Sequence, residues 1–63
     1  MKNELKTLRA ERDWTQSDLA DRVSVSRQTI NAIEKGKFDP SLPVAFRIAK
    51  AFELTIEQVF ADE

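Results

Sequence analysis

The sequence contains no cysteine and no histidine, and it has only one glycine and two prolines. The first two absences exclude a disulfide-linked scaffold, a zinc finger, and any catalytic pair of serine or cysteine with histidine. So few glycines and prolines provide too few turns for a multi-stranded sheet. We therefore expect helices joined by short connections.

The chain also lacks a long hydrophobic run. None of its apolar stretches approaches the ~20 residues that span a bilayer, and residues 1–4, Met-Lys-Asn-Glu, lack the apolar centre of a signal peptide. A cytoplasmic protein is therefore expected. Hydrophobic residues make up 41% of the 63 residues, which is enough for one core, so residues 1–63 are predicted to form a single domain of marginal stability.

Charge is nearly balanced over the whole chain but unevenly placed along it. The net charge is −1, yet residues 1–37 carry +2 and residues 38–63 carry −3. Such a chain can present one basic face although its sum is near zero. Taken alone, the pattern favours an ordinary mixture of solvated charges over a nucleic-acid-binding face.

Apolar periodicity and capping residues predict five short helices, at residues 3–12, 15–24, 26–36, 41–52 and 55–60. Their expected N-caps are Asn3, Thr15, Ser26, Ser41 and Thr55. Thr15 with Asp18, and Thr55 with Gln58, have the spacing of a capping box. Gly36 is expected just after the end of the third helix, and the last three residues are expected to fray.

Apolar side chains at helical spacing form the predicted core. They are Leu5, Leu8, Leu19, Val23, Ile30, Ile33, Leu42, Ala45, Ile48, Phe52, Ile56 and Phe60. Trp14 is expected to cover the edge of this core rather than to stack on a nucleotide. Val44 and Phe46 fall away from the main stripe of the fourth helix, and an exposed phenylalanine on so small a protein suggests a partner surface. Phe38 is expected either to pack locally or to contact DNA or a second subunit.

The second and third predicted helices are separated only by residues 23–25, Val-Ser-Val. Two helices with so short a connection must cross steeply, and Ala20 supplies a small side chain for the crossing. This is the spacing of the helix-turn-helix motif, whose second helix lies in the major groove of DNA. The motif is expected at about residues 15–35.

Several separated motifs extend the similarity. They are Thr15-Gln16, Leu19-Ala20, Val-Ser-Arg-Gln-Thr-Ile at residues 25–30, Ile-Glu-Lys-Gly-Lys at residues 33–37, and Pro40-Ser41-Leu42. In this order and with these gaps, the sequence resembles the Cro and phage-repressor type of helix-turn-helix regulators, the xenobiotic-response-element family, over about Leu5 to Phe60. The resemblance implies an all-α fold, a compact five-helix bundle that binds DNA, usually as a dimer on a palindromic operator.

One position departs from that family, because Ser24 stands in the turn where glycine is common. If the turn requires a positive φ, serine costs roughly 1 kcal/mol relative to glycine. A Ser24→Gly substitution is then expected to stabilise the fold.

The third helix provides the expected base contacts. With Ile30 and Ile33 turned inward, at 100° per residue, the outward and flanking residues are Arg27, Gln28, Asn31, Ala32 and Lys35. Arginine pairs with guanine, asparagine and glutamine pair with adenine, and an alanine methyl can touch the thymine methyl. The predicted base-contacting residues are Arg27, Gln28, Asn31 and Ala32. On helix periodicity alone, the same residues would form an ordinary solvated face.

Phosphate contacts are expected around this helix. Thr15 and Gln16 stand at the start of the second helix, where free backbone N–H groups favour an anion, and the family resemblance also implies a phosphate-contacting glutamine at Gln16. Lys35 and Lys37 flank the end of the third helix and are expected to hold the opposite strand. Arg12 is a weaker candidate, with pairing to a nearby acid as its alternative.

Arg9 and Glu34 are interpreted as structural. Arg9 lies on the inner stripe of the first helix, Glu34 lies beside Ile30 and Ile33, and similar domains contain a partly buried ion pair at this place. Removing one partner of such a pair could cost several kcal/mol. The alternative is two exposed charges worth under about 1 kcal/mol.

The sequence therefore predicts a sequence-specific regulator of transcription, a repressor, that inserts residues 26–35 into the major groove of double-stranded DNA as a homodimer on a palindromic site. The expected dimer interface contains Val44, Phe46 and Val59. The alternative is a protein-interaction or antitoxin-like module with the same fold, which the low net charge favours. An enzyme is not expected, and neither is a metal, a cofactor or a small-molecule ligand.

Overall fold

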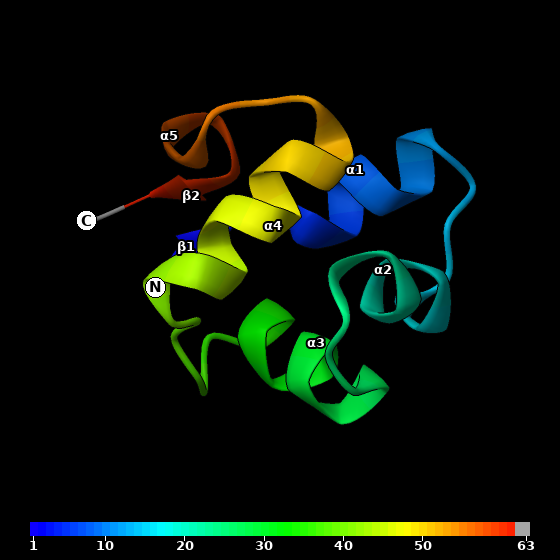
Figure 1. Ribbon diagram of the computed structural model, residues 1–63, viewed down its shortest axis with the longest axis horizontal. Coiled ribbons are helices and arrows are strands. Elements are labelled where there is room, and N and C mark those ends of the chain that lie inside the picture. Colours follow the sequence, from blue (N-terminus) through cyan, green and yellow to red (C-terminus); the bar gives the residue numbers. More distant parts are fainter. Residues whose placement is uncertain (62–63) are drawn as a thin grey trace.

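The computed structural model describes residues 1–61, in which five helices are accompanied by two very short strands. The elements are β1 (Lys2–Asn3), α1 (Leu5–Glu11), α2 (Gln16–Val23), α3 (Arg27–Glu34), α4 (Leu42–Phe52), α5 (Ile56–Val59) and β2 (Phe60–Ala61). Figure 1 shows α4 in the middle of the molecule, with α1 and α5 on one side and α2 and α3 on the other. The expected helical bundle is confirmed.

Side-chain caps begin four of the helices at the expected residues. In α2 the Thr15 hydroxyl accepts the Asp18 N–H at 3.0 Å, and the Asp18 carboxylate accepts the Thr15 N–H at 2.9 Å. Thr55 and Gln58 form the same reciprocal pair at the start of α5. Ser26 and Ser41 accept N–H groups in the first turns of α3 and α4. Each cap satisfies a backbone donor that the helix itself leaves unpaired.

The start of α1 differs from the prediction, because Asn3 lies in β1 and Glu4 occupies the N-cap without a side-chain hydrogen bond. The Asn3 side chain still accepts the Leu5 N–H at 3.2 Å, and its amide donates to the Ile33 carbonyl at 2.8 Å. Asn3 therefore connects the N-terminal segment to the end of α3 instead of capping α1.

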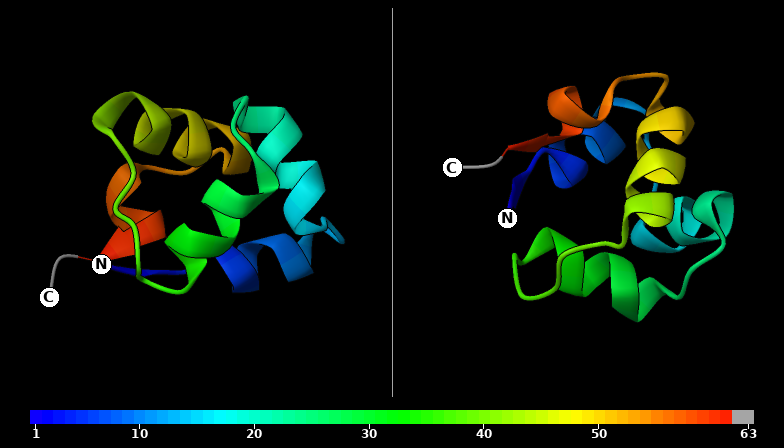
Figure 2. Two further views of the ribbon diagram at one scale, coloured as in Figure 1. Left: turned by 90° about the horizontal axis from the view of Figure 1, so that it is seen from below. Right: turned by 60° about the vertical axis from the view of Figure 1, so that its left-hand side comes forward.

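The two strands pair antiparallel and close the molecule at the end opposite the α2–α3 corner. Lys2 lies opposite Ala61 and Asn3 opposite Phe60, and Figures 1 and 2 show the two segments side by side in every view. Strands of two residues give no alternating pattern, which is why the sequence did not predict them. Ala61, which was expected to fray, is part of this pair, whereas the other two residues of that prediction, 62 and 63, lie outside the described range.

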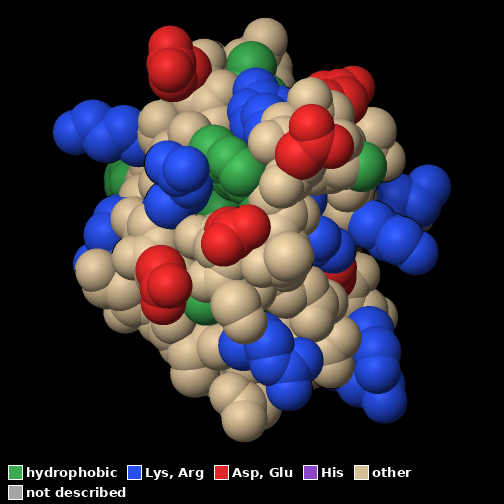
Figure 3. All heavy atoms as spheres, turned by 90° about the vertical axis from the view of Figure 1, so that its right-hand side faces the viewer, with side chains coloured by type: hydrophobic (Ala, Val, Ile, Leu, Met, Phe, Trp, Pro, Cys, Tyr) green, Lys and Arg blue, Asp and Glu red, His purple; other side chains and the backbone are tan. Residues whose placement is uncertain are grey.

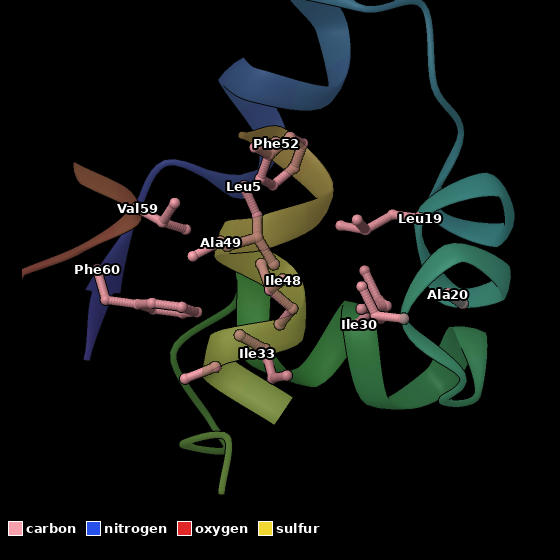
Figure 4. Close-up of a cluster of buried hydrophobic side chains, with 12 residues drawn as sticks. Leu5, Leu19, Ala20, Ile30, Ile33, Ile48, Ala49, Phe52, Val59 and Phe60 are labelled. Carbon is pink, nitrogen blue, oxygen red and sulfur yellow. The ribbon is translucent and has the colours of Figure 1, made fainter. Parts of the chain in front are cut away.

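The core lies between α4 and the helices around it, and Figure 4 shows its side chains converging. Its buried members are Leu5, Leu19, Ala20, Val23, Ile30, Ile33, Ala45, Ile48, Ala49, Phe52, Val59 and Phe60. Leu8 and Ile56 pack against this set while remaining partly exposed. Leu42 was predicted to be in the core but is 64% exposed, because it begins α4, one turn before the first buried residue of that helix.

The turn between α2 and α3 has the conformation that the short connection requires. Ser24 ends α2 in the left-handed region, with φ 61° and ψ 43°, and the next N–H, that of Val25, donates to the Ala20 carbonyl at 3.1 Å. Gly36, with φ 74°, follows the end of α3 as expected. None of the helices within residues 1–61 has the length and hydrophobicity of a membrane span.

Candidate nucleic-acid interface

One side of α3 faces away from the core. Arg27 and Gln28 are exposed and Asn31 and Ala32 are half-buried, whereas Ile30 and Ile33 on the opposite side are buried. Figure 3 shows the face that includes α2: Lys and Arg side chains stand at its lower edge, at the level of α3 in Figure 1, and are interspersed with Asp and Glu side chains above it. The four predicted base-contacting residues lie on one helix, with Arg27 and Gln28 exposed to solvent.

A partly buried ion pair supports this helix from behind. Arg9 Nε donates to Glu34 Oε2 at 2.6 Å and Nη2 donates to Oε1 at 3.0 Å, with side-chain exposures of 14% for Arg9 and 8% for Glu34. The third donor, Nη1, bonds the Trp14 carbonyl at 3.0 Å. The hydrogen bonds to Glu34 raise the pKa of Arg9 above its ordinary value, against the opposing effect of burial. The predicted contact between Arg9 and Glu34 is present and joins α1 to α3; its contribution to stability stays a prediction.

Gln16, the first residue of α2, connects the ion pair to the polar face of α3. Its Nε2 donates to Glu34 Oε1 at 3.1 Å and to Asn31 Oδ1 at 3.2 Å. Its Oε1 accepts from Arg27 Nη1 at 3.4 Å. From the sequence, Gln16 was predicted only as a phosphate contact. Its contacts with Arg27, Asn31 and Glu34 could not be predicted from helix spacing, because spacing does not tell how α2 and α3 are rotated against each other.

The remaining expected phosphate contacts lie around this network, with one exception. Lys35 and Lys37 are exposed at and after the end of α3, and Thr15 is exposed at the start of α2. Arg12 instead donates to the carbonyls of Leu8 and Phe52, each at 3.0 Å. Its Nη1 also lies 3.6 Å from Glu11 Oε1, which is the pairing with a nearby acid given as the alternative for Arg12. Because its guanidinium is held by these groups, we leave Arg12 out of the proposed DNA contacts.

The aromatic side chains near this corner serve the core. Trp14 stacks on Phe52 with ring centroids 5.4 Å apart and an interplanar angle of 20°. Arg22 covers the outer face of Trp14 at 4.1 Å, and Arg12 lies 5.0 Å from the Phe52 ring. Trp14 is therefore a core-edge residue, as predicted, and its ring is already occupied by protein groups.

The three residues expected at a dimer interface have different environments. Phe46 is 58% exposed, and Val44 is partly buried against the core. Val59 is only 1% exposed, so its assignment to an interface is wrong: α5 turns this side chain inward, onto the core. A groove between α4 and α5 runs beside Phe46, and it is lined by Phe46, Arg47, Ala49, Lys50, Leu54, Thr55, Ile56 and Glu57.

Known proteins share both the sequence and the fold. The profile of the family described as helix-turn-helix matches residues 5–59. An uncharacterized HTH-type transcriptional regulator of Methanocaldococcus jannaschii is 60% identical over 63 residues, which are 100% of this chain and 96% of that protein. The antitoxin HipB of Escherichia coli O6:H1 is 33% identical over 54 residues, which are 86% of this chain and 57% of that protein.

Among solved structures, the restriction-modification controller protein C.AhdI of Aeromonas hydrophila has the same arrangement of helices. It superposes with a TM-score of 0.82 at 25% sequence identity, covering 89% of this chain and 85% of that one. The matched profile spans both helices of the motif and the ion pair behind them. This chain belongs to the Cro and phage-repressor type of helix-turn-helix transcriptional regulators.

Proposed function

We propose that this protein is a sequence-specific repressor that inserts residues 26–35 into the major groove of double-stranded DNA. The observation that supports this most strongly is the two-sided character of α3. Ile30 and Ile33 hold it against the core, while Arg27 and Gln28 are exposed at its N-terminal end. The N-terminal residues of a recognition helix are the ones that contact base edges. Residues 1–63 would then act as one DNA-binding domain.

The contacts divide into bases and phosphates. Arg27, Gln28 and Asn31 carry the donors and acceptors that recognise purines, and the Ala32 methyl suits thymine. For the phosphates, Lys35 and Lys37 supply cations after α3. At the start of α2, both hydrogens of the Gln16 amide are used inside the protein, so we assign the phosphate there to backbone N–H groups at the N-terminus of α2 and to the Thr15 hydroxyl.

Selection of bound sequences from random duplex DNA at moderate salt tests this function. We expect enrichment of one half-site, repeated with inverted symmetry about one helical turn, near 34–36 Å, away. Binding to the selected site should weaken steeply with salt, since each neutralised phosphate contributes about 0.9 to the slope of log K against log salt. A folded protein that enriches no sequence would refute the proposal.

We further propose that two copies associate through the groove between α4 and α5. Phe46 is exposed there beside apolar Leu54 and Ile56, while Lys50 and Glu57 give its two sides opposite charges. A twofold axis would bring each side against its complement in the other copy. The groove is thus self-complementary in both charge and hydrophobicity.

Sedimentation equilibrium of Phe46→Glu tests the interface, with Phe38→Glu as the matched control. Both phenylalanines are about half exposed, but Phe38 lies in the loop between α3 and α4 and does not line the groove. We expect Phe46→Glu to weaken dimerisation and Phe38→Glu to leave it unchanged. Equal behaviour of the two variants would remove the groove as the interface.

The second candidate is an antitoxin-like module that binds a protein partner. It is favoured by the 33% identity with an antitoxin and by the exposed groove. The selection of bound DNA sequences distinguishes the two functions. A defined half-site with steeply salt-dependent binding supports the regulator, whereas a folded protein that selects no DNA sequence supports the antitoxin-like module.

A further inference from the structure

We propose that Gln16 is a positioning residue for base recognition. Fixed by the partly buried Glu34 carboxylate, Gln16 holds the Asn31 amide in one orientation, so that Asn31 offers its N–H donors and selects against cytosine. This inference rests on the proposed DNA-binding function. It assigns to Gln16 a role in choosing bases, in addition to any effect on phosphate binding.

The anchor of the arrangement is the Glu34 carboxylate. Its Oε1 receives hydrogen bonds from Arg9 Nη2 at 3.0 Å and from Gln16 Nε2 at 3.1 Å. An ionised carboxylate can only accept hydrogen bonds. The Gln16 atom that faces it must therefore be the amide nitrogen, and the bidentate pair with Arg9 keeps the carboxylate itself from turning.

The other end of the chain of contacts imposes the same polarity. Arg27 has only donors, and its Nη1 lies 3.4 Å from Gln16 Oε1. With nitrogen toward Glu34 and oxygen toward Arg27, the second hydrogen of Gln16 Nε2 points to Asn31, where Oδ1 accepts it at 3.2 Å. The amide of Asn31 is thereby oriented with its oxygen toward α2.

This orientation leaves the Asn31 Nδ2 group for a ligand, since within residues 1–61 it forms no hydrogen bond. In the major groove, purines present N7 as an acceptor and thymine presents O4, whereas cytosine presents the N4 donor. Two donors facing each other cannot bond. Turning the amide over would suit cytosine, but it would also place Nδ2 against Gln16 Nε2, so the network disfavours it.

The test is Gln16→Met, which keeps the length of the side chain, removes both of its donors and leaves the ion pair of Arg9 with Glu34 in place. The base position is first identified as the one whose preference disappears in Asn31→Ala. At this position the wild-type protein should discriminate against cytosine by about 5- to 150-fold, the range of one good base contact. We expect Gln16→Met to reduce that discrimination to within about twofold of parity, while the preference at the Gln28 position is kept.

Lys35→Met is the matched control, because it removes a proposed phosphate contact outside the network. It should weaken binding to all sequences equally and keep the discrimination against cytosine. If Gln16→Met behaves in the same way, Gln16 contacts only phosphate and the inference is overturned.

A second measurement needs no DNA. In the free wild-type protein, NOEs from the Asn31 side-chain amide protons, which report the rotation about the Cβ–Cγ bond, should show a single orientation of the amide. Gln16→Met should average the two orientations, while Lys35→Met should not. Unchanged NOEs in Gln16→Met would overturn the inference even if DNA binding is normal. If the wild-type protein selects no half-site, the proposed function fails, and the NOEs alone decide whether Gln16 positions Asn31.

Discussion

Replacing Ser24 by glycine should stabilise the protein, because the structure places Ser24 in the left-handed region at φ 61°. An L-residue costs about 1–2 kcal/mol in this conformation, and glycine adopts it without that penalty. Glycine also makes the unfolded chain more flexible, which takes back about 0.4–1 kcal/mol. With the midpoint of each range, the free energy of unfolding should therefore rise by about 0.8 kcal/mol.

Nothing on the side chain offsets this gain. Ser24 is exposed, its side chain forms no hydrogen bond within residues 1–61, and its backbone N–H bonds the Ala20 carbonyl whichever residue is present. For a domain of this size, 1 kcal/mol corresponds to about 4–8 °C in melting temperature. We expect a rise of about 2–8 °C, measured by circular dichroism and checked by urea unfolding.

Ser17→Gly is the control, because it makes the same substitution at an exposed residue inside α2. Glycine is a poor helix former, so the melting temperature should fall there. Glu53, with φ 60° at the end of α4, should respond to glycine as Ser24 does. A fall for Ser24→Gly of the size seen for Ser17→Gly would refute the argument from backbone strain.

Three further predictions follow from the interface and its support. Glu34→Ala should lower the free energy of unfolding by up to about 3–5 kcal/mol in urea titration, since it removes the opposite charge from the partly buried Arg9 guanidinium and leaves it only the Trp14 carbonyl; an unchanged midpoint would show that the pair contributes little. Hydrogen bonds from the Thr15 backbone and side chain lower the pKa of Asp18. The capping box should therefore stabilise the protein at neutral pH and lose that contribution as the pH falls through this lowered pKa. In Asp18→Asn, the free energy of unfolding should depend less on pH below about pH 5 than it does in the wild-type protein. Arg27→Ala should relax the preference at one base position at a cost of about 1–3 kcal/mol in competition binding, whereas an equal loss for every sequence would reassign Arg27 to a phosphate.

The helices were predictable because their signals are local. A capping hydroxyl such as Thr15, the glycine at Gly36 and apolar residues three or four apart each act within one or two turns of the chain. The strands were not predictable, since two residues give no period and their pairing joins the two ends of the described chain. Leu42 was misplaced because periodicity gives the side of a helix on which a residue lies and not how far the core extends along it.

In the candidate site too, features set by a single helix were predictable, and contacts between helices were not. The outward residues of α3 followed from helix geometry, and the family resemblance pointed to the pair of Arg9 with Glu34, which the structure confirms. The bonds from Gln16 to Asn31 and Arg27 depend on the rotation of α2 against α3. Similarly, Val59 was predicted to lie on the surface, because a helix of four residues is too short to show an apolar periodicity that identifies its buried side.

The support of α3 by side chains from two other helices limits how this protein can be re-engineered. Arg9 comes from α1 and Gln16 from α2, and both contact α3 at Glu34. Transplanting residues 26–35 into another scaffold would move the side chains proposed to contact bases without the groups that support them in this structure. A graft intended to transfer DNA preference should therefore include Arg9 and Gln16 together with the helix.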